Sequence, residues 1–216
     1  MDIGGDIAKG MQSAEKIEIF FAILLLFATL GSAFCVYEAH KWGGVQGVAF
    51  GDSSRLRAES IRMDALANAQ TMIDVQVFLD WVDAKNSNQT IRADFLEKRF
   101  RKEFLPAFEA WRNQPGFSGA GEIPPGTPFS FSQYQPDSRI NATRLAEEAT
   151  AAFDQGRQAN AIGDSYILNT VLFAIVLFLA GFGTKWRSKK LQYLFLVAGI
   201  GISVYAIGFL LTLPRI

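Results

Sequence analysis

The side chains best suited to hold a metal ion or move a proton are Glu38 and His40, in the stretch YEAHKWGGVQG at residues 37–47. His40 is the single histidine of the chain. On a helix, a spacing of two residues places the two side chains about 200° apart, so one copy does not present both to one ion. A metal site here would need several copies, each contributing one His40 around a symmetry axis.

The rest of the sequence lacks the patterns of known catalytic centres. It has no H-E-x-x-H or C-x-x-C pair, no glycine-rich phosphate loop and no nicotinamide or flavin fingerprint. The single cysteine, Cys35, has no second cysteine for an intrachain disulfide or a thiolate metal site. We therefore expect no catalytic residue, no metal and no cofactor, and we predict a non-enzymatic protein. An interfacial enzyme or metal site at Glu38 and His40 is the least favoured alternative.

Polar residues at the ends of apolar runs suggest a second kind of chemistry, the passage of ions. Glu18 precedes the first run, and Asn169 and Thr170 lie near the start of the second. Ionisable groups are absent from the middle of these runs, where transport pathways usually place one. A homo-oligomeric ion channel lined by these residues is therefore the alternative function.

The elements that position these residues are three apolar runs, at residues 19–37, 166–183 and 191–213. A helix needs about 20 mostly apolar residues to cross a bilayer, and charge is absent from these runs but dense between them. The first run is longer than the apolar part of a signal peptide, so we treat it as a retained membrane anchor. The sequence predicts three transmembrane helices. Equal numbers of basic and acidic residues, 21 each, give no field that would attract nucleic acid.

The short loop TKWRSKK at residues 184–190 sets the orientation, because it carries four positive charges and no acid. The positive-inside rule places this loop in the cytoplasm, together with an N-terminal tail of residues 1–18. Residues 38–165 and the C-terminal residues 214–216 then lie outside the cell membrane. Aromatic side chains agree with this orientation as interface anchors: Tyr37, Trp42 and Tyr166 on the outer side, Trp186 and Tyr193 on the inner side.

The outer segment is predicted to form a helical bundle. Gly43 and Gly44 permit the chain to stop or kink before a helix at residues 52–84. That helix has a three-four spacing of apolar and small residues typical of a packed seam: Ala58, Ile61, Ala65, Asn68, Met72, Val75, Leu79 and Val82. A second helix is expected from about Gln89 to Trp111, kinked at Pro106. Its aromatic face is interpreted as bundle core: Phe100, Phe104, Phe108 and Trp111.

Residues 113–137 contain five prolines and four glycines and are predicted to be an irregular loop. Long loops inside compact domains are usually functional or disordered. We expect this loop to pack against another surface, because it carries four aromatic side chains: Phe117, Phe129, Phe131 and Tyr134. Packing over its own bundle is the favoured interpretation, and a partner site is the alternative.

A single helix is predicted from Ser138 to Gly183, running from the bundle into the membrane. Its seam keeps the three-four spacing throughout: Leu145, Ala149, Ala152, Gly156, Ala159, Gly163, Tyr166, Thr170, Ala174, Leu177 and Gly181. Small residues let helices approach closely. The third span adds a pair, Gly199 and Ser203, and a neighbouring face of Ala198, Gly201 and Gly208. The seams can pack within one copy or between copies.

The arrangement resembles an uncharacterised family of bacterial multi-span membrane proteins. In that family a first span ends in a tyrosine and a glutamine or glutamate, followed by W-G-G-x-Q, which correspond here to Tyr37, Glu38 and WGGVQ at residues 42–46. The stretch NAIGDSYILNTVLFAIVLFLAGFG, residues 160–183, is similar to the second-span region of the family. The resemblance implies the three-span plan and carries no activity or catalytic residue.

The expected fold is all-α, with three transmembrane helices and an extracytoplasmic helical bundle. The expected function is that of an oligomeric assembly, sensory or binding protein of the cell membrane. Its outer helical domain would engage a partner protein, a lipid or a ligand, and its partners would be membrane lipids, further copies of the chain and another membrane or extracytoplasmic protein. A helix that runs from such a domain into the bilayer is a means of transmitting displacement.

Overall fold

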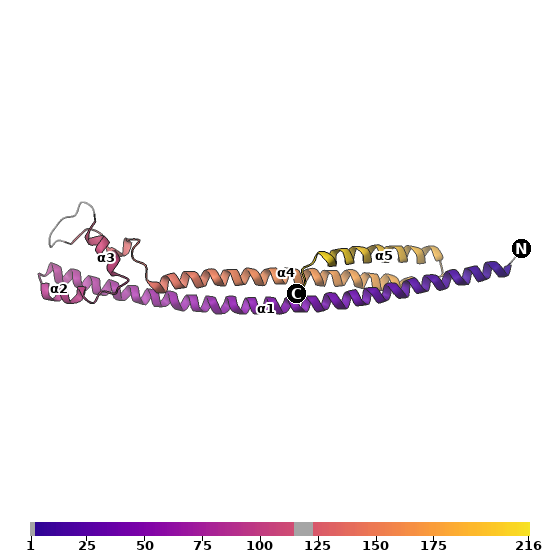
Figure 1. The fold of residues 1–216 in the computed structure, drawn as a ribbon, viewed down its shortest axis with the longest axis horizontal. Coiled ribbons are helices and arrows are strands. Elements are labelled where there is room, and N and C mark those ends of the chain that lie inside the picture. Colours follow the sequence, from indigo (N-terminus) through magenta and orange to yellow (C-terminus); the bar gives the residue numbers. More distant parts are fainter. Residues whose placement is uncertain (1–2, 115–122) are drawn as a thin grey trace. The chain divides into compact units, whose positions relative to one another are not determined.

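The computed structural model describes residues 3–114 and 123–216, with side chains from Lys16 onward, and Phe117 lies outside the described residues. The described chain is helical and contains no strand. Its elements are α1 (Ile3–Asn86), α2 (Thr90–Glu97), α3 (Leu105–Arg112), the 3-10 turn η1 (Pro128–Ser130), α4 (Asp137–Gly183) and α5 (Lys189–Thr212) (Figure 1). By length and composition, α1, α4 and α5 each contain a stretch apolar enough to cross a membrane.

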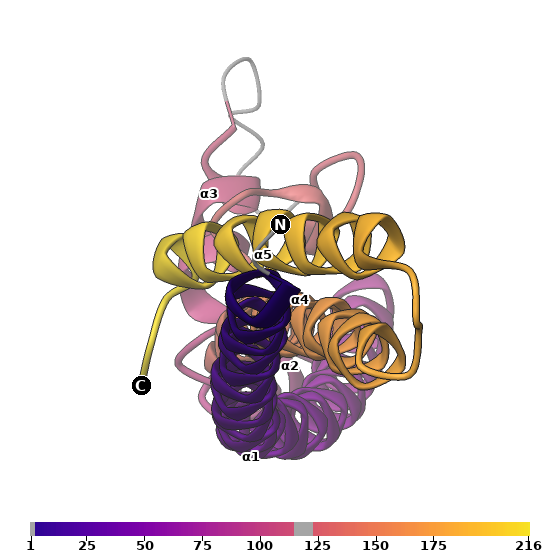
Figure 2. The same cartoon turned by 90° about the vertical axis from the view of Figure 1, so that its right-hand side faces the viewer.

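The chain divides into two compact units. Unit 1 comprises Met1–Phe50 and Phe153–Ile216, and unit 2 comprises Gly51–Ala152. Both long helices, α1 and α4, contribute to both units. In unit 1, α5 lies beside α1 and α4, as the two views show (Figures 1 and 2). Large apolar side chains of the three helices form the core of unit 1, among them Phe21, Leu24, Phe173, Val176 and Leu196.

The predicted break at Gly43 and Gly44 is wrong, because α1 continues through both glycines without interruption. A glycine inside a helix lowers the stability of the helix by about 1 kcal/mol relative to alanine. The long α1 helix forms through both glycines despite this cost. The expected helix from Gln89 to Trp111 is also wrong, since the chain forms α2 and α3 there. Pro106 lies in the first turn of α3, where its missing N–H is tolerated, so it starts a helix instead of kinking one.

The long helix predicted from Ser138 to Gly183 is present as α4. Its predicted seam is buried or half-buried from Leu145 to Thr170. Beyond Thr170 the buried positions become Phe173, Val176 and Ala180, whereas Ala174 and Gly181 are exposed. In this apolar part of α4, the large side chains of Phe173 and Val176 make the contacts with the core of unit 1, because they fill the space towards α1 and α5.

In α5 the predicted small pair, Gly199 and Ser203, is buried in unit 1. A Cβ at Gly199 would lie 2.8 Å from Leu24 Cδ2, so the glycine allows α1 to approach. The neighbouring face of Ala198, Gly201 and Gly208 is exposed. The pair therefore serves packing within one copy, and the second face has no such role among the described residues.

Candidate functional site

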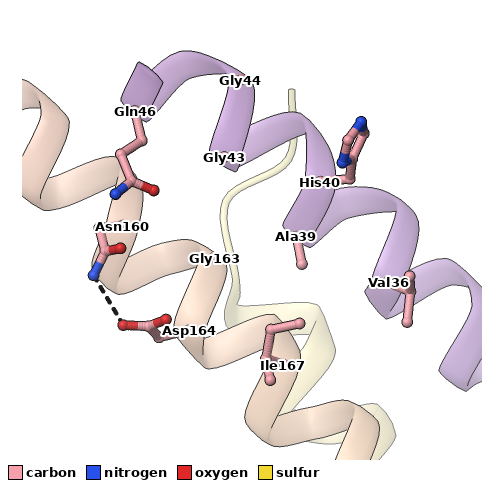
Figure 3. A pocket seen from close by; sticks show the side chains of 10 residues that line it. All are labelled: Val36, Ala39, His40, Gly43, Gly44, Gln46, Asn160, Gly163, Asp164 and Ile167. Atoms are coloured by element: carbon pink, nitrogen blue, oxygen red, sulfur yellow. Dashed lines mark hydrogen bonds between the residues drawn. The ribbon is translucent and has the colours of Figure 1, made fainter. Parts of the chain in front are cut away.

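The stretch around His40 borders a hollow of about 630 Å³ between α1 and α4 of unit 1 (Figure 3). On the α1 side, Gly43, Gly44 and Gln46 line it, and on the α4 side Asn160 and Asp164 do. Asn160 Nδ2 donates a hydrogen bond of 2.9 Å to Asp164 Oδ2. In Figure 3 the side chains of Gln46, Asn160 and Asp164 lie in one row at one end of the hollow. We call this hollow the α1–α4 groove.

Glu38 and His40 do not meet in the structure. Glu38 is only 4% exposed and packs into unit 1, with its Oε1 3.4 Å from Lys41 Nζ. Its Oε2 has no hydrogen-bond partner among the described residues. His40 is exposed at the edge of the α1–α4 groove, and its ring points away from α4 in Figure 3. The angular separation expected from their spacing is therefore confirmed.

The last residues of the chain pack beside this part of α1. Trp42 Nε1 and Tyr166 OH both donate to the carbonyl oxygen of Pro214, at 3.2 and 3.0 Å, and Lys41 Nζ donates to the carbonyl oxygen of Ile216. Tyr166 is fully buried in unit 1. Of the other aromatic side chains predicted to anchor the protein at the membrane interface, Trp42 is half-buried and three are exposed: Tyr37, Trp186 and Tyr193.

Asn169 lies at the centre of the three helices of unit 1 and is completely buried. Its Nδ2 donates to the carbonyl oxygen of Ala206 at 3.2 Å and lies 3.5 Å from Cys35 Sγ, so its side chain connects α4 with both α5 and α1. Thr170 Oγ1 donates to the carbonyl oxygen of Tyr166 within α4. Glu18 is exposed. Asn169 and Thr170 thus use their donors for contacts inside one copy.

Gly43, Gly44 and Gly47 have no close neighbour, although all three lie inside α1. A Cβ built on any of them meets no atom within 4 Å. Glycine lowers helix stability by about 0.5–1 kcal/mol per residue relative to alanine. Close packing does not require glycine at these positions, in contrast to Gly31, where a Cβ would lie 2.5 Å from the ring of Phe173.

Unit 2 has an aromatic core, which we call the aromatic cluster: Phe78, Trp81, Phe100, Phe104, Phe108 and Trp111. The predicted aromatic face of the second helix is therefore buried as expected, although it is divided between α3 and the turn before it. Phe129, Phe131 and Tyr134 of the loop pack against the same cluster. The Phe129 ring lies 5.1 Å from the Phe104 ring and 5.1 Å from the Tyr134 ring. The described part of the loop packs over its own bundle.

Asp74 of α1 connects the loop to the helix beneath it. Asp74 is 3% exposed. Its carboxylate accepts a hydrogen bond of 2.9 Å from Tyr134 OH and forms an ion pair with Arg101 at 3.4 Å. Burial raises the pKa of Tyr134 to about 12, so its hydroxyl stays protonated and remains a donor. Burial also raises the pKa of the Asp74 carboxyl above its usual value, against the opposing effects of Tyr134 and Arg101.

This raised pKa gives the stability of unit 2 a pH dependence. Because the folded-state pKa lies above the unfolded value of 3.8, folding favours the protonated carboxyl. The contribution is complete below pH 3.8 and is lost as the pH rises through the folded pKa. We expect the free energy of unfolding of the natural chain, relative to Asp74→Asn, to fall as the pH rises. Urea unfolding at a series of pH values, followed by tryptophan fluorescence, measures this difference. A relative stability that rises with pH would mean that Tyr134 and Arg101 outweigh burial.

The seam predicted for residues 52–84 is wrong in register. The buried positions of α1 from Ser53 to Asp74 are small or polar: Ser53, Ser60, Ala67 and Asp74. Ser53 and Ser60 each donate a hydrogen bond of 2.7 Å to a carbonyl oxygen of α4, those of Ala149 and Ala142. These bonds let the two backbones approach closely, so α4 packs against the polar face of α1.

The predicted apolar seam of α1 is mostly exposed instead. We call its exposed part the α1 stripe: Ala58, Ile61, Ala65, Asn68, Met72 and Leu79. Ile61, Met72 and Leu79 are 65%, 73% and 53% exposed. From Ala58 to Leu79 the stripe extends about 32 Å along the helix at 1.5 Å per residue. Apolar side chains recur along this length, interrupted by Asn68.

Sequence analysis placed Gln46, Asn160 and Asp164 in the stretches that carry the family resemblance but assigned them no role, and it did not single out Asp74. A usable signal for the groove was the spacing of four between Asn160 and Asp164, which places both on one side of α4 next to Gly163. The partners of Asp74 come from the turn before α3 and from the loop, and no local pattern brings them together.

Comparison of the chain with protein-family models, with curated proteins and with solved structures finds no match.

Proposed function

We propose that the protein is a non-enzymatic assembly protein of the cell membrane, whose copies associate through the α1 stripe. The observation that carries this proposal is the exposure of Ile61, Met72 and Leu79, whose spacings of 11 and 7 residues return to one face of α1, the face that α4 leaves open. Removing such side chains from water contributes about 1.5–3 kcal/mol each when burial is complete. The spacing is that of a helix packed against another helix.

The proposed topology supports a second copy as the partner. The basic loop at residues 184–190 faces the cytoplasm in this proposal, so α1 leaves the bilayer with unit 2 outside the cell. Copies in one membrane then share an orientation, and their stripes lie parallel and at the same height. A rotation axis along the membrane normal brings identical stripes together, which is the geometry of a closed symmetric oligomer. Asn68, a polar residue within the stripe, would fix the register of such a contact.

The channel receives less support than assembly. Asn169, the polar side chain deepest in unit 1, is fully buried and donates to Ala206 and Cys35 of its own copy. A pore for ions would therefore have to be lined by other polar groups. Assembly through unit 2 requires no pore and uses a surface that one copy leaves open to solvent.

The test of the proposal is the number of copies in the extracted particle. We expect native mass spectrometry of the full chain in nanodiscs to show several copies. Ile61→Glu combined with Met72→Glu should weaken the association by about tenfold or more, because unpaired charges would be buried in the contact. A matched control combines Leu66→Glu with Ile73→Glu, which are also exposed apolar positions of α1 but lie off the stripe.

The control should keep the copy number of the natural chain. A natural chain that runs as a single copy would contradict the proposal. So would a stripe variant that keeps its copy number, or a control pair that loses it equally.

A further inference from the structure

The α1–α4 groove has two chemically different ends. Val36 and Ile167, each 51% exposed, line one end, and Gln46, Asn160 and Asp164 line the other (Figure 3). Val36 is among the last residues of the apolar run at 19–37, and Ile167 is among the first of the run at 166–183. In the proposed topology the apolar end therefore lies at the outer edge of the hydrocarbon, and the polar end lies among the headgroups.

The glycines keep this groove open. Gly43 and Gly44 line it, and a Cβ on either residue would meet no atom within 4 Å, so it would lie in open space. Gly47, one turn further along α1, has the same open surroundings but does not line the groove. The absence of side chains at the first two positions thus has a specific effect on the shape of the site, which a glycine elsewhere on α1 lacks.

The charge of the groove favours a cation. Asp164 is the lining residue with a formal charge when His40 is neutral, and none of the ion pairs among the described residues includes it. One of its oxygens accepts the hydrogen bond from Asn160, which orients the carboxylate. A carboxylate forms its stronger hydrogen bonds with charged donors such as an ammonium group. The amide groups of Gln46 and Asn160 are suited to donate to a neighbouring phosphate.

We propose that the α1–α4 groove binds a phospholipid with a primary amine headgroup from the outer leaflet. The ammonium group lies at Asp164, the phosphate at the amides of Gln46 and Asn160, and the first part of the acyl chains along Val36 and Ile167. This inference rests on the proposed topology but not on self-association, because all the groups named come from unit 1 of one copy.

The test compares two lipids that differ in the headgroup alone. The purified full chain is titrated with phosphatidylethanolamine or phosphatidylglycerol of identical acyl chains, and bound lipid is counted by native mass spectrometry. We expect preferential retention of the amine lipid by the natural chain. Asp164→Asn should reduce its binding by about tenfold and abolish the preference. Asp154→Asn, which changes an exposed acid of α4 outside the groove, should leave both unchanged.

A second pair of variants tests the shape of the groove. Gly43→Leu fills the groove and should abolish preferential retention, whereas Gly47→Leu should preserve it. Both changes add a good helix former to the same helix, so helix stability should rise in both. The inference is overturned if the natural chain retains both lipids equally, if Asp164→Asn keeps the preference, or if the two leucine variants behave alike. The same spectra report copy number, so a failure of the lipid site is distinguished from a failure of assembly.

Discussion

Phe104→Ala is expected to lower the free energy of unfolding of unit 2 by about 3–5 kcal/mol, the range for truncating a buried phenylalanine. Phe104 is completely buried, and its ring contacts others from several segments, including Phe78 of α1, Phe108 of α3 and Phe129 of the loop. Removing it leaves a cavity at the point where these segments meet. Urea unfolding of the full chain in detergent measures the change, followed by the fluorescence of Trp81 and Trp111 after Trp42 and Trp186 have been replaced by phenylalanine.

Phe95→Ala is the matched control for this prediction. Phe95 is a phenylalanine of the same unit, but it is 52% exposed and has Arg99 over its ring. Its truncation should cost less than about 1 kcal/mol, since an exposed cation–π contact contributes about 0.5–1 kcal/mol. Equal losses for the two variants would show that the aromatic cluster does not hold unit 2 together.

Gly31→Leu is expected to disrupt the packing of α1 against α4 in unit 1. The first atom of any side chain at Gly31 would lie 2.5 Å from Cζ of Phe173, so this ring, which is only 2% exposed, would have to shift within the core. Overpacking of this kind typically costs about 1–3 kcal/mol, and a whole leucine in place of a hydrogen atom belongs at the upper end. Unfolding by titration with a denaturing detergent measures the loss.

Gly201→Leu serves as the control for Gly31→Leu. Gly201 also lies in an apolar helix, α5, but a Cβ there meets no atom within 4 Å. This variant should unfold at the same detergent concentration as the natural chain or at a higher one. If Gly31→Leu were equally stable, the close contact between Gly31 and Phe173 would not exist in the folded protein.

Helices and core positions that are determined by the pattern of residues within one segment could be predicted from the sequence. Charge-free apolar runs predicted three helices that are long and apolar enough to cross a membrane, and a small-residue seam predicted α4 to within one residue at its start. The aromatic face around Phe104 and Phe108 was predicted as core because large rings dominate burial. These features depend on spacing along one segment.

Features that depend on which faces meet could not be predicted. Periodicity found an apolar face in residues 52–84, at Ile61 and Met72, but α4 packs on the face of Ser53 and Ser60, whose hydroxyls bond to its backbone. The glycines at 43 and 44 suggested a break, because their cost to a helix is visible in the sequence while the stability of the surrounding helix is not. The polar end of the groove combines residues more than 100 positions apart, which no local pattern records.

The measurement that tests the proposed assembly most directly is disulfide cross-linking along α1 in native membranes. Cys35, the single natural cysteine, is first replaced by alanine, and cysteines are then introduced one at a time from Ser60 to Met72. A disulfide needs Cα atoms roughly 4.4–6.8 Å apart, so only positions at the contact should form one efficiently. We predict dimers at Ile61, Ala65, Asn68 and Met72, and few at Ser60 and Ala67, which are buried in unit 2. Uniform cross-linking, or maxima at Ser60 and Ala67, would contradict assembly through the α1 stripe.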